Sequence, residues 1–288
     1  MIIAVASGKG GTGKTTVAVN LARSLDRPVH LLDCDVEEPN ANLFLHGASE
    51  RTEEVTLPVP VVDTAKCDGC NECGRFCQYH AIASFGSQAL VFPELCHGCG
   101  GCMLVCPHGA ITETPRRIGV VEMARSGEVT ALTGRLDVGV ALAPPLIRAL
   151  TRRIVPETTT ILDAPPGTSC SVVTTVRSAD AVVLVTEPTP FGLHDLTLAV
   201  DTVRALGVPF GVVVNRVGVG DGRVHAYCAA ERIPVLLDIS DDRRIAEVYS
   251  SGRMMVEALP EYRALFGELW HAVEKLAAKK KGSREAVR

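Results

Sequence analysis

Eight of the eleven cysteines lie in two short segments with identical spacing, and this regularity is the strongest chemical signal in the sequence. Each segment has the form C-x2-C-x2-C-x3-C, a spacing that lets a short loop place three thiolates around one face of a four-iron, four-sulfur cluster. Two such segments predict two 4Fe–4S clusters. The expected ligands are Cys67, Cys70, Cys73 and Cys77 in the first cysteine segment and Cys96, Cys99, Cys102 and Cys106 in the second.

The fourth cysteine of each segment is expected to serve the cluster of the other segment, because in two-cluster proteins of this spacing the last thiolate points away from the first three. Cys106 would then complete the site of the first segment, and Cys77 that of the second. Zinc is the competing metal, but zinc sites usually combine two cysteine pairs rather than two triplets that each have a fourth cysteine. A disulfide framework is the other alternative, and it is typical of short secreted chains.

A glycine-rich loop after the first apolar run predicts a phosphate site. Residues 8–15 have the sequence GKGGTGKT and match G-x-x-x-x-G-K-S/T between a predicted buried strand and a predicted helix. Backbone amides of such a loop surround phosphate oxygens, Lys14 supplies charge to the β- and γ-phosphates, and the Thr15 hydroxyl can bind Mg²⁺. The expected nucleotide-binding residues are Gly8, Lys9, Gly10, Gly11, Thr12, Gly13, Lys14, Thr15 and Thr16.

Two acidic segments follow predicted strands and could serve this site. Asp35 ends an Asp-Cys-Asp segment that begins at Asp33, and Asp163 begins an Asp-Ala-Pro-Pro-Gly segment. A carboxylate near a γ-phosphate can orient water and accept its proton, while an acid at a strand end can equally cap a helix or face solvent. Residue type alone leaves both interpretations open.

A second lysine inside the loop, Lys9, gives the sequence KGGTGKT. This sequence resembles the deviant Walker A loop of the MinD, ParA, Mrp and nitrogenase iron protein class of ATPases. The resemblance implies an ATP-dependent homodimer, or a heterodimer with a related ATPase, in which Lys9 reaches the partner's phosphates. A solvated loop lysine is the alternative interpretation.

The same resemblance assigns roles to the other residues. It implies that Lys9, Lys14, Asp35 and Asp163 are catalytic, that Asp35 positions the attacking water, and that Asp163 holds Mg²⁺ through water. The resemblance also implies three further binding residues. The amide of Gly167 would sense the γ-phosphate, Asn40 matches the family's switch asparagine, and Asn215 would contact adenine. Asn215 could equally do no more than terminate a strand. ATP and Mg²⁺ are therefore the expected ligands of this part of the chain.

The cysteine-rich stretch is predicted to be a separate domain. Composition shifts to cysteine, glycine and proline between residues 58 and 114, and the two cysteine segments are an internal repeat. The second ends in Cys-Pro, the full pattern of a bacterial ferredoxin, whereas the first ends in Cys-Gln. The stretch therefore resembles a two-cluster ferredoxin. We predict an inserted α+β ferredoxin-like domain at residues 58–114 and a discontinuous ATPase domain at residues 1–57 and 115–288.

Hydrophobic patterns predict the elements that would position these residues. Short β-branched runs indicate strands at residues 2–6, 29–32, 159–162, 181–185 and 210–214. Apolar residues spaced by three and four indicate helices near residues 14–25, 192–206, 222–231, 241–251 and 262–278. Ser126-Gly127 is typical of a hairpin turn. The alternation of strands and helices predicts an α/β fold with a parallel sheet, as in P-loop NTPases of the SIMIBI, MinD-like class.

Composition and charge bear on the expected location of the protein and on its expected partners. The chain has 288 residues, 47% hydrophobic and 22% charged, without a membrane-length apolar run or a signal peptide. We therefore expect a cytoplasmic protein without stable membrane insertion. The net charge of −4 provides no chain-wide basic field, so we expect no nucleic-acid partner. An apolar stripe from Leu265 to Leu276, ahead of Lys279, Lys280 and Lys281, should pack on the sheet, with membrane binding as the alternative.

These patterns together predict an ATP-hydrolysing iron–sulfur protein in which a MinD-like nucleotide switch controls two clusters. The leading hypothesis is assembly or delivery of iron–sulfur or other metal clusters to an acceptor protein. The alternatives are an ATP-gated electron carrier, similar in logic to the nitrogenase iron protein, and a redox-sensing regulatory ATPase. The remaining cysteines, Cys34, Cys170 and Cys228, are expected to be structural, although two copies of Cys170 could share a cluster across a dimer.

Overall fold

The computed structural model describes residues 1–45, 47 and 49–285, and the side chains of residues 49 and 279–285 lie outside that description. The chain divides into two compact units. The first unit comprises residues 1–52, 121–135 and 147–288, and the second comprises residues 53–120 and 136–146.

A nine-stranded sheet has the strand order β11-β10-β9-β1-β8-β2-β7-β6-β3. The strands are β1 (Ile2–Ala6), β2 (Val29–Asp33), β3 (Ser49–Val62), β6 (Ile111–Ser126), β7 (Val129–Leu136), β8 (Thr159–Asp163), β9 (Ala181–Thr186), β10 (Phe210–Val217) and β11 (Val235–Ser240). Neighbouring strands are parallel from β11 through to β7. The five predicted strands are confirmed as β1, β2, β8, β9 and β10, and they differ from the prediction only at their C-terminal ends.

The sheet changes direction after β7. β6 ends at Ser126 and β7 begins at Val129, so Gly127 and Glu128 alone join them and the chain must reverse. Gly127 has a φ of 57°, a left-handed conformation that glycine adopts without a steric penalty. The predicted hairpin turn is thus confirmed. The predicted parallel sheet is confirmed from β11 through to β7, and the sheet as a whole is mixed, because parallel neighbours need a crossover much longer than two residues.

Helices lie between the strands of this sheet and after its last strand, β11. They are α1 (Lys14–Ser24), α2 (Asn42–Leu45), α5 (Ala143–Thr151), α6 (Cys170–Val176), α7 (Pro190–Ala205), α8 (Arg223–Ala230), α9 (Arg243–Ser250), α10 (Met255–Ala258) and α11 (Pro260–Glu285). The predicted helices correspond to α1, α7, α8, α9 and α11. Asp242 caps α9, since its side chain accepts a hydrogen bond from the amide of Arg244 at 2.8 Å. The short α2, α6 and α10 were not predicted, because one or two turns carry too little periodicity, and α5 was not predicted either.

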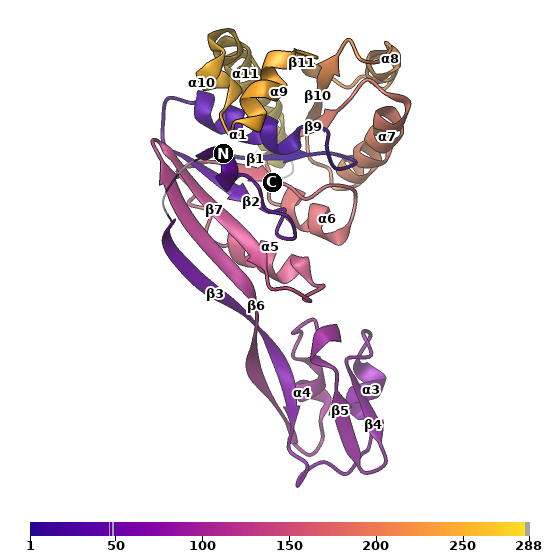
Figure 1. The fold of residues 1–288 in the computed structure, drawn as a ribbon. Coiled ribbons are helices and arrows are strands. Elements are labelled where there is room, and N and C mark those ends of the chain that lie inside the picture. The colour runs from indigo at the N-terminus through magenta and orange to yellow at the C-terminus, as the bar shows by residue number, and fades with distance from the viewer. Residues whose placement is uncertain (46, 48, 286–288) are drawn as a thin grey trace. The chain divides into compact units, whose positions relative to one another are not determined.

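The core of the first unit joins strands that are distant in sequence. Ile3, Leu31, Ile161 and Val183 are fully buried on one face of the sheet, together with side chains of α1, α10 and α11. Figure 1 shows these helices on one side of the sheet and α6 and α7 on the other. The fold is therefore a three-layer α/β arrangement with the ends of the central strands free to form a site.

The C-terminal apolar stripe packs into this core. Phe266, Leu269 and Val273 on α11 are all fully buried. The predicted packing is confirmed for these side chains, whereas the side chains of Lys279, Lys280 and Lys281 lie outside the described part of the chain. Within the described residues, no helix combines the length and apolar character needed to cross a membrane.

The second unit contains the cysteine-rich region. Its elements are α3 (Glu72–Phe76), β4 (Ile82–Phe85), β5 (Gln88–Val91), the 3-10 helix η1 (Pro93–Leu95) and α4 (Gly101–Val105). β4 and β5 form an antiparallel sheet of their own. β3 and β6 continue as regular strands through the predicted boundaries at 58 and 114, which is why this unit is wider than the predicted insert. An insertion is thus present, and its ferredoxin-like character stays a prediction.

Candidate functional site

The predicted phosphate loop lies between β1 and α1, as its motif requires. Gly13 has a φ of 91°, and a Cβ added there would lie 2.4 Å from Nδ2 of Asn215, so the position requires glycine. Nδ2 of Asn215 donates to the carbonyl of Thr12 at 2.8 Å. Asn215 therefore supports the loop, and its contact with adenine stays a prediction.

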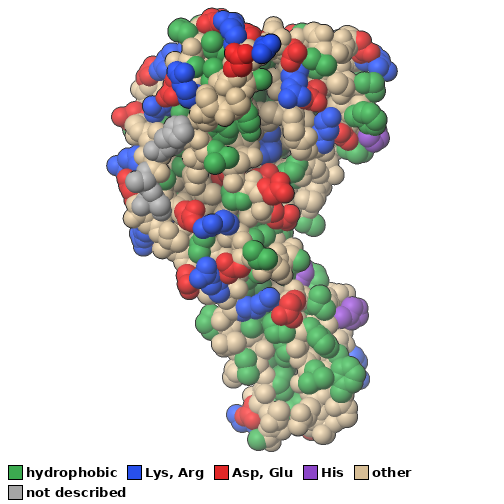
Figure 2. Space-filling view, viewed as in Figure 1, with side chains coloured by type: hydrophobic (Ala, Val, Ile, Leu, Met, Phe, Trp, Pro, Cys, Tyr) green, Lys and Arg blue, Asp and Glu red, His purple; other side chains and the backbone are tan. Residues whose placement is uncertain are grey.

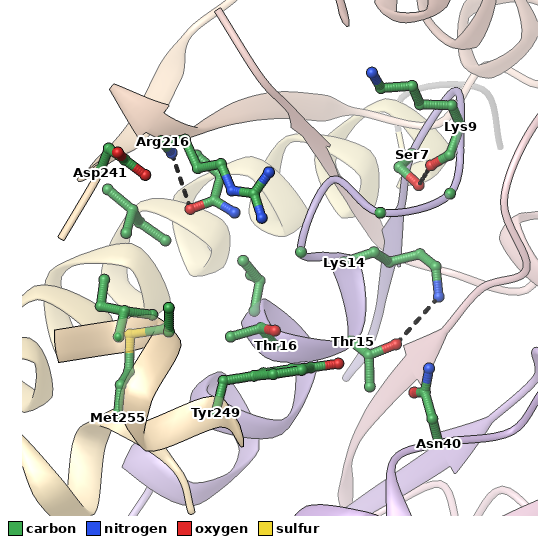
Figure 3. A pocket seen from close by; sticks show the side chains of 18 of the residues that line it. Ser7, Lys9, Lys14, Thr15, Thr16, Asn40, Arg216, Asp241, Tyr249 and Met255 are labelled. Carbon is green, nitrogen blue, oxygen red and sulfur yellow. Dashed lines mark hydrogen bonds between the residues drawn. The ribbon is translucent and has the colours of Figure 1, made fainter. Parts of the chain in front are cut away.

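A cavity of about 660 Å³ borders this loop. It is completed by the segment after β2 and by side chains such as Tyr249 on α9 and Met255 on α10. Figure 3 shows Lys14 pointing toward Thr15, with Tyr249 extending across the cavity beside them. The predicted residues that line it are Lys9, Gly10, Gly11, Gly13, Lys14, Thr15, Thr16, Asp35, Asn40 and Asn215. Tyr249 and Met255 were missed, because residues of α9 and α10 reach the cavity only through the fold.

Lys14 is the centre of a buried charge cluster. Its Nζ donates to Oδ1 of Asp163 at 2.7 Å and lies 3.8 Å from Oδ2 of Asp35. Burial opposes the charge on this lysine, but the two carboxylates outweigh it and raise the pKa of Lys14. Asp163 is fully buried and, among the described residues, its Oδ2 has no hydrogen-bond partner. A carboxylate oxygen in that situation suits a cation or its bound water, which fits the predicted Mg²⁺ role of Asp163.

Asp33 anchors the segment that carries Asp35. Its Oδ2 accepts from the amides of Asn40 and Ala41, each at 2.9 Å, and its Oδ1 accepts from the amide of Asp35 at 3.2 Å. Burial, reinforced by Asp163, raises the pKa of Asp33 to about 7. The sequence predicted roles for Asp35 and Asn40 but none for Asp33. The signal for Asp33 was its place as the last residue of a buried strand.

Two glycines fix the neighbouring segments against the loop. A Cβ on Gly8 would lie 2.1 Å from the carbonyl oxygen of Asp195, so α7 can approach only a glycine there. The amide of Gly167, which was predicted to sense the γ-phosphate, donates to the carbonyl of Ser7 at 2.9 Å. A phosphate contact by Gly167 would require this hydrogen bond to break.

Lys9 is in an ion pair, which differs from the alternative of a solvated lysine. Its Nζ lies 3.5 Å from Oε2 of Glu187, and its side chain is 31% exposed. In Figure 3 the side chain of Lys9 extends away from that of Lys14. Glu187 was not among the predicted residues, since it follows β9 and is brought to the loop by the pairing of β9 with β1.

The cysteines of the two segments gather in two sets of four within the second unit. The first four-cysteine set lines one cavity and consists of Cys67, Cys70, Cys73 and Cys106. The second four-cysteine set lines another cavity and consists of Cys77, Cys96, Cys99 and Cys102. Each set combines three cysteines of one segment with the last cysteine of the other, which is the grouping expected for crossed ligation. The ligation itself stays a prediction.

The surroundings of both sets fit a thiolate-bound cluster. Three thiol sulfurs accept hydrogen bonds from backbone amides at 3.4 Å, and the pairs are Cys77 with Ala81, Cys96 with Gly98, and Cys106 with Ala110. Gly69 and Gly98 have positive φ angles of 78° and 64°, which lets the chain curve tightly around the sulfurs. Converging thiols with amide donors are the donor set that a 4Fe–4S cluster requires.

The other three cysteines differ in exposure. Cys34 and Cys228 are buried, as expected for structural thiols. Cys170 is exposed at the first residue of α6, so burial does not support the structural role expected for it, and its role stays a prediction. Burial raises the pKa of Cys228 to about 11, which keeps that thiol protonated.

Comparison with known proteins shows the family of this chain. The profile of the CobQ/CobB/MinD/ParA nucleotide binding domain matches residues 3–255, which include every residue of the nucleotide cavity. The chain belongs to this family. It is therefore a P-loop ATPase of the CobQ/CobB/MinD/ParA family.

Relatives of this MinD/ParA-family ATPase include iron–sulfur proteins. An uncharacterized protein of Methanocaldococcus jannaschii is 31% identical over 271 residues, covering 89% of this chain and 92% of that protein. An iron–sulfur cluster carrier protein of Pyrococcus abyssi is 28% identical over 218 residues, covering 74% of this chain and 60% of that protein. A cytosolic Fe–S cluster assembly factor, the Nubp2 homolog of Anopheles gambiae, is 26% identical over 288 residues, covering 90% of each.

Solved structures of two MinD proteins share the fold. The Pyrococcus furiosus cell division ATPase MinD has a TM-score of 0.62 and 23% identity, covering 96% of this chain and 98% of that one. The septum site-determining protein MinD of Pyrococcus horikoshii, solved with Mg-ADP, has a TM-score of 0.60 and 24% identity, covering 97% and 98%. At these identities the likeness establishes the fold alone.

The raised pKa of Asp35 predicts how ATP hydrolysis by this MinD/ParA-family ATPase depends on pH. Burial raises the pKa of Asp35 to about 6; Lys14 opposes the shift, and Asp163 and Glu38 add to it. A base must be ionised to accept a proton, and the ionised fraction of Asp35 falls as pH drops through about 6. We therefore expect kcat/KM for ATP hydrolysis, which reports groups of the free enzyme, to fall on an acid limb near pH 6.

The Glu38→Gln variant is the matched test of this limb. It removes a negative charge that raises the pKa of Asp35, so the limb should move to lower pH. An unmoved limb would assign the titration to another group. A profile without any acid limb would remove Asp35 as the base.

Proposed function

We propose that this ATPase uses ATP binding and hydrolysis to control two 4Fe–4S clusters, and that it serves assembly or delivery of iron–sulfur clusters to an acceptor protein. The observation that carries the proposal is the presence, in one chain, of a nucleotide cavity and two four-cysteine sets. The relatives named as a cluster carrier and a cluster assembly factor support the assembly role.

In the proposed nucleotide site, residues of the phosphate loop and of the neighbouring strand ends have separate roles. Lys14 and the loop amides would bind the phosphates, and Thr15 and Asp163 would hold Mg²⁺ directly and through water. Asp35, kept in place by Asp33, would accept the proton of the attacking water. Lys9 would contact phosphates across a dimer of two copies, or of this chain and a related ATPase.

The order of elements supports control of the cysteine region by the nucleotide. The segment from Asp35 to Asn40 lines the nucleotide cavity, α2 follows it at once, and β3 then leads the chain into the second unit. A γ-phosphate that moves Asp35 thus acts at the start of the chain segment that enters the second unit. When bound, the clusters would supply electrons or a transferable iron–sulfur group, while the cysteines and their amide donors hold them.

A second candidate function is ATP-gated electron transfer. Each four-cysteine set has enough thiols to complete the coordination of its cluster without another subunit. Complete coordination favours resident clusters, because a cluster that is delivered must leave its ligands. This candidate keeps the same nucleotide site and changes only what is passed to the acceptor.

An anaerobic transfer assay distinguishes the two functions. Reduced holoprotein is mixed with Mg-ATP and an apo iron–sulfur protein, and iron and electrons on the acceptor are measured separately. We expect iron to move to the acceptor with ATP and to stay in place with ADP. Loss of electrons with all iron retained would replace assembly by electron transfer. Hydrolysis that responds to redox state, with neither iron nor electrons moved, would favour the regulatory alternative.

A further inference from the structure

Glu187 is a buried carboxylate shared by two cations at the edge of the nucleotide cavity. Its Oε2 lies 3.5 Å from Nζ of Lys9, and its Oε1 accepts from the Arg216 guanidinium at 2.9 Å. The side chain of Glu187 is 11% exposed, while those of Lys9 and Arg216 are 31% and 56% exposed. Both cations line the nucleotide cavity. One fixed anion thus holds two positive charges that a polyphosphate would otherwise attract.

The backbone keeps this carboxylate in place. The carbonyl of Glu187 accepts from the amide of Thr189 at 2.8 Å, and Thr189 caps α7 by accepting from Gly192 at 3.0 Å. A Cβ on Gly192 would lie 2.2 Å from the Glu187 carbonyl oxygen, so the first turn of α7 packs directly on this residue. The junction between β9 and α7 therefore leaves the Glu187 backbone little freedom to move.

Lys9 is followed by a part of the loop with open space around it. The next two residues are Gly10 and Gly11, and a Cβ added at either would meet no atom within 4 Å. Gly11 also has a φ of 79°, a conformation open mainly to glycine. The Ser7 hydroxyl donates to the Lys9 carbonyl at 2.7 Å, so when the ion pair breaks it is the long, partly exposed side chain of Lys9 that moves.

We propose that Glu187 is a positioning residue that holds Lys9 away from the phosphates it would contact across the dimer, and that ATP bound by the dimer must draw Lys9 from Glu187 in order to be bound fully. This inference rests on the proposed contact between Lys9 and phosphate. A population of protein in which Lys9 stays paired with Glu187 lowers the apparent affinity for ATP by the fraction that is competent to bind. The Lys9–Glu187 ion pair thus determines the ATP concentration at which Lys9 leaves Glu187 for the phosphates.

The test is the affinity of the holoprotein for ATP and for adenosine, measured by calorimetry for wild type and for Glu187→Gln. The glutamine keeps the shape and removes the charge, so the dissociation constant for ATP should fall about threefold, the scale of a partly exposed ion pair. Adenosine has no phosphate and should bind equally to both proteins. Equal or weaker binding of ATP by the variant would overturn the proposal, as would an equal gain for adenosine.

A double-mutant cycle with Lys9→Ala shows whether the effect passes through Lys9. Most of the gain from Glu187→Gln should disappear when Lys9 is already alanine, and a gain that persists in full would contradict the role assigned to Lys9. The matched control is Glu231→Gln, because Glu231 pairs with Arg204 at 2.7 Å outside the cavity and should not change ATP affinity.

Glu187→Asp provides a second variant if the glutamine does not fold. It keeps the charge but shortens the side chain, so ATP should bind more tightly than to wild type and by a smaller factor than to Glu187→Gln. Unchanged or weaker binding would count against the proposal. Because nucleotide affinity is measured without an acceptor protein, failure here is separate from failure of the iron or electron transfer assay.

Discussion

Replacing Cys77 and Cys102 together by alanine should remove one cluster and leave the other, so that about four of about eight irons per chain remain. Both cysteines belong to the second four-cysteine set, although they come from different cysteine segments. Once one ligand of a cluster is lost, loss of a second ligand of the same cluster adds little. The measurement is iron and acid-labile sulfide per chain after anaerobic purification, with the spectrum of the reduced protein.

A second pair of substitutions distinguishes crossed ligation from ligation within one cysteine segment. Cys102 and Cys106 lie in the same segment but in different sets, so Cys102→Ala/Cys106→Ala should remove both clusters. If each segment instead held its own cluster, the two outcomes would be exchanged, since the pair with Cys77 would empty both sites. Cys228→Ala, which removes a cysteine on α8, is the control that should retain all iron. Zinc in place of iron in the wild-type protein would refute the cluster assignment itself.

The Asp163→Asn variant should lose at least about 100-fold in the rate of ATP hydrolysis, the scale of removing one electrostatic contact to a transferring group. Asp163 is fully buried, and its Oδ2, beside the phosphate loop, has no hydrogen-bond partner among the residues that the structure describes. Asparagine keeps the shape and removes the charge that Mg²⁺ requires. Phosphate release and the Mg²⁺ dependence of ATP binding are the measurements.

The expected signature is loss of magnesium dependence with intact clusters. Wild-type protein should bind ATP more tightly with Mg²⁺ than without it, and Asp163→Asn should show little difference. Iron content should not change, because Asp163 lies in the first unit and the cysteine sets lie in the second. Asp221→Asn changes an exposed carboxylate paired with Arg223 at 2.8 Å and serves as the matched control. Hydrolysis at half the wild-type rate in Asp163→Asn would show that Mg²⁺ is held elsewhere.

Local patterns predicted much of the nucleotide site. The strand, glycine loop and helix are contiguous, so the order of residues 2 to 24 already determines where Lys14 and Thr15 lie relative to a bound phosphate. Asp35 and Asp163 could be placed near them because carboxyl ends of neighbouring parallel strands meet at one edge. Glu187, Tyr249 and Met255 could not be predicted, since no local motif marks them and each arrives through a long-range contact.

The sequence by itself determined which kinds of chemistry this protein has the residues for. The spacing of eight cysteines, the residues of the glycine loop and the hydrophobic periods are local properties, and they predicted the kind of site, the kind of fold and the five central strands. The tertiary structure alone decided which groups act together. It tied Asp33 to the amides of Asn40 and Ala41, placed Tyr249 and Met255 at the nucleotide cavity, and brought Glu187 to Lys9. The physical reason is that contacts between residues distant in sequence depend on strand pairing and burial over the whole chain. They cannot be predicted from any short segment.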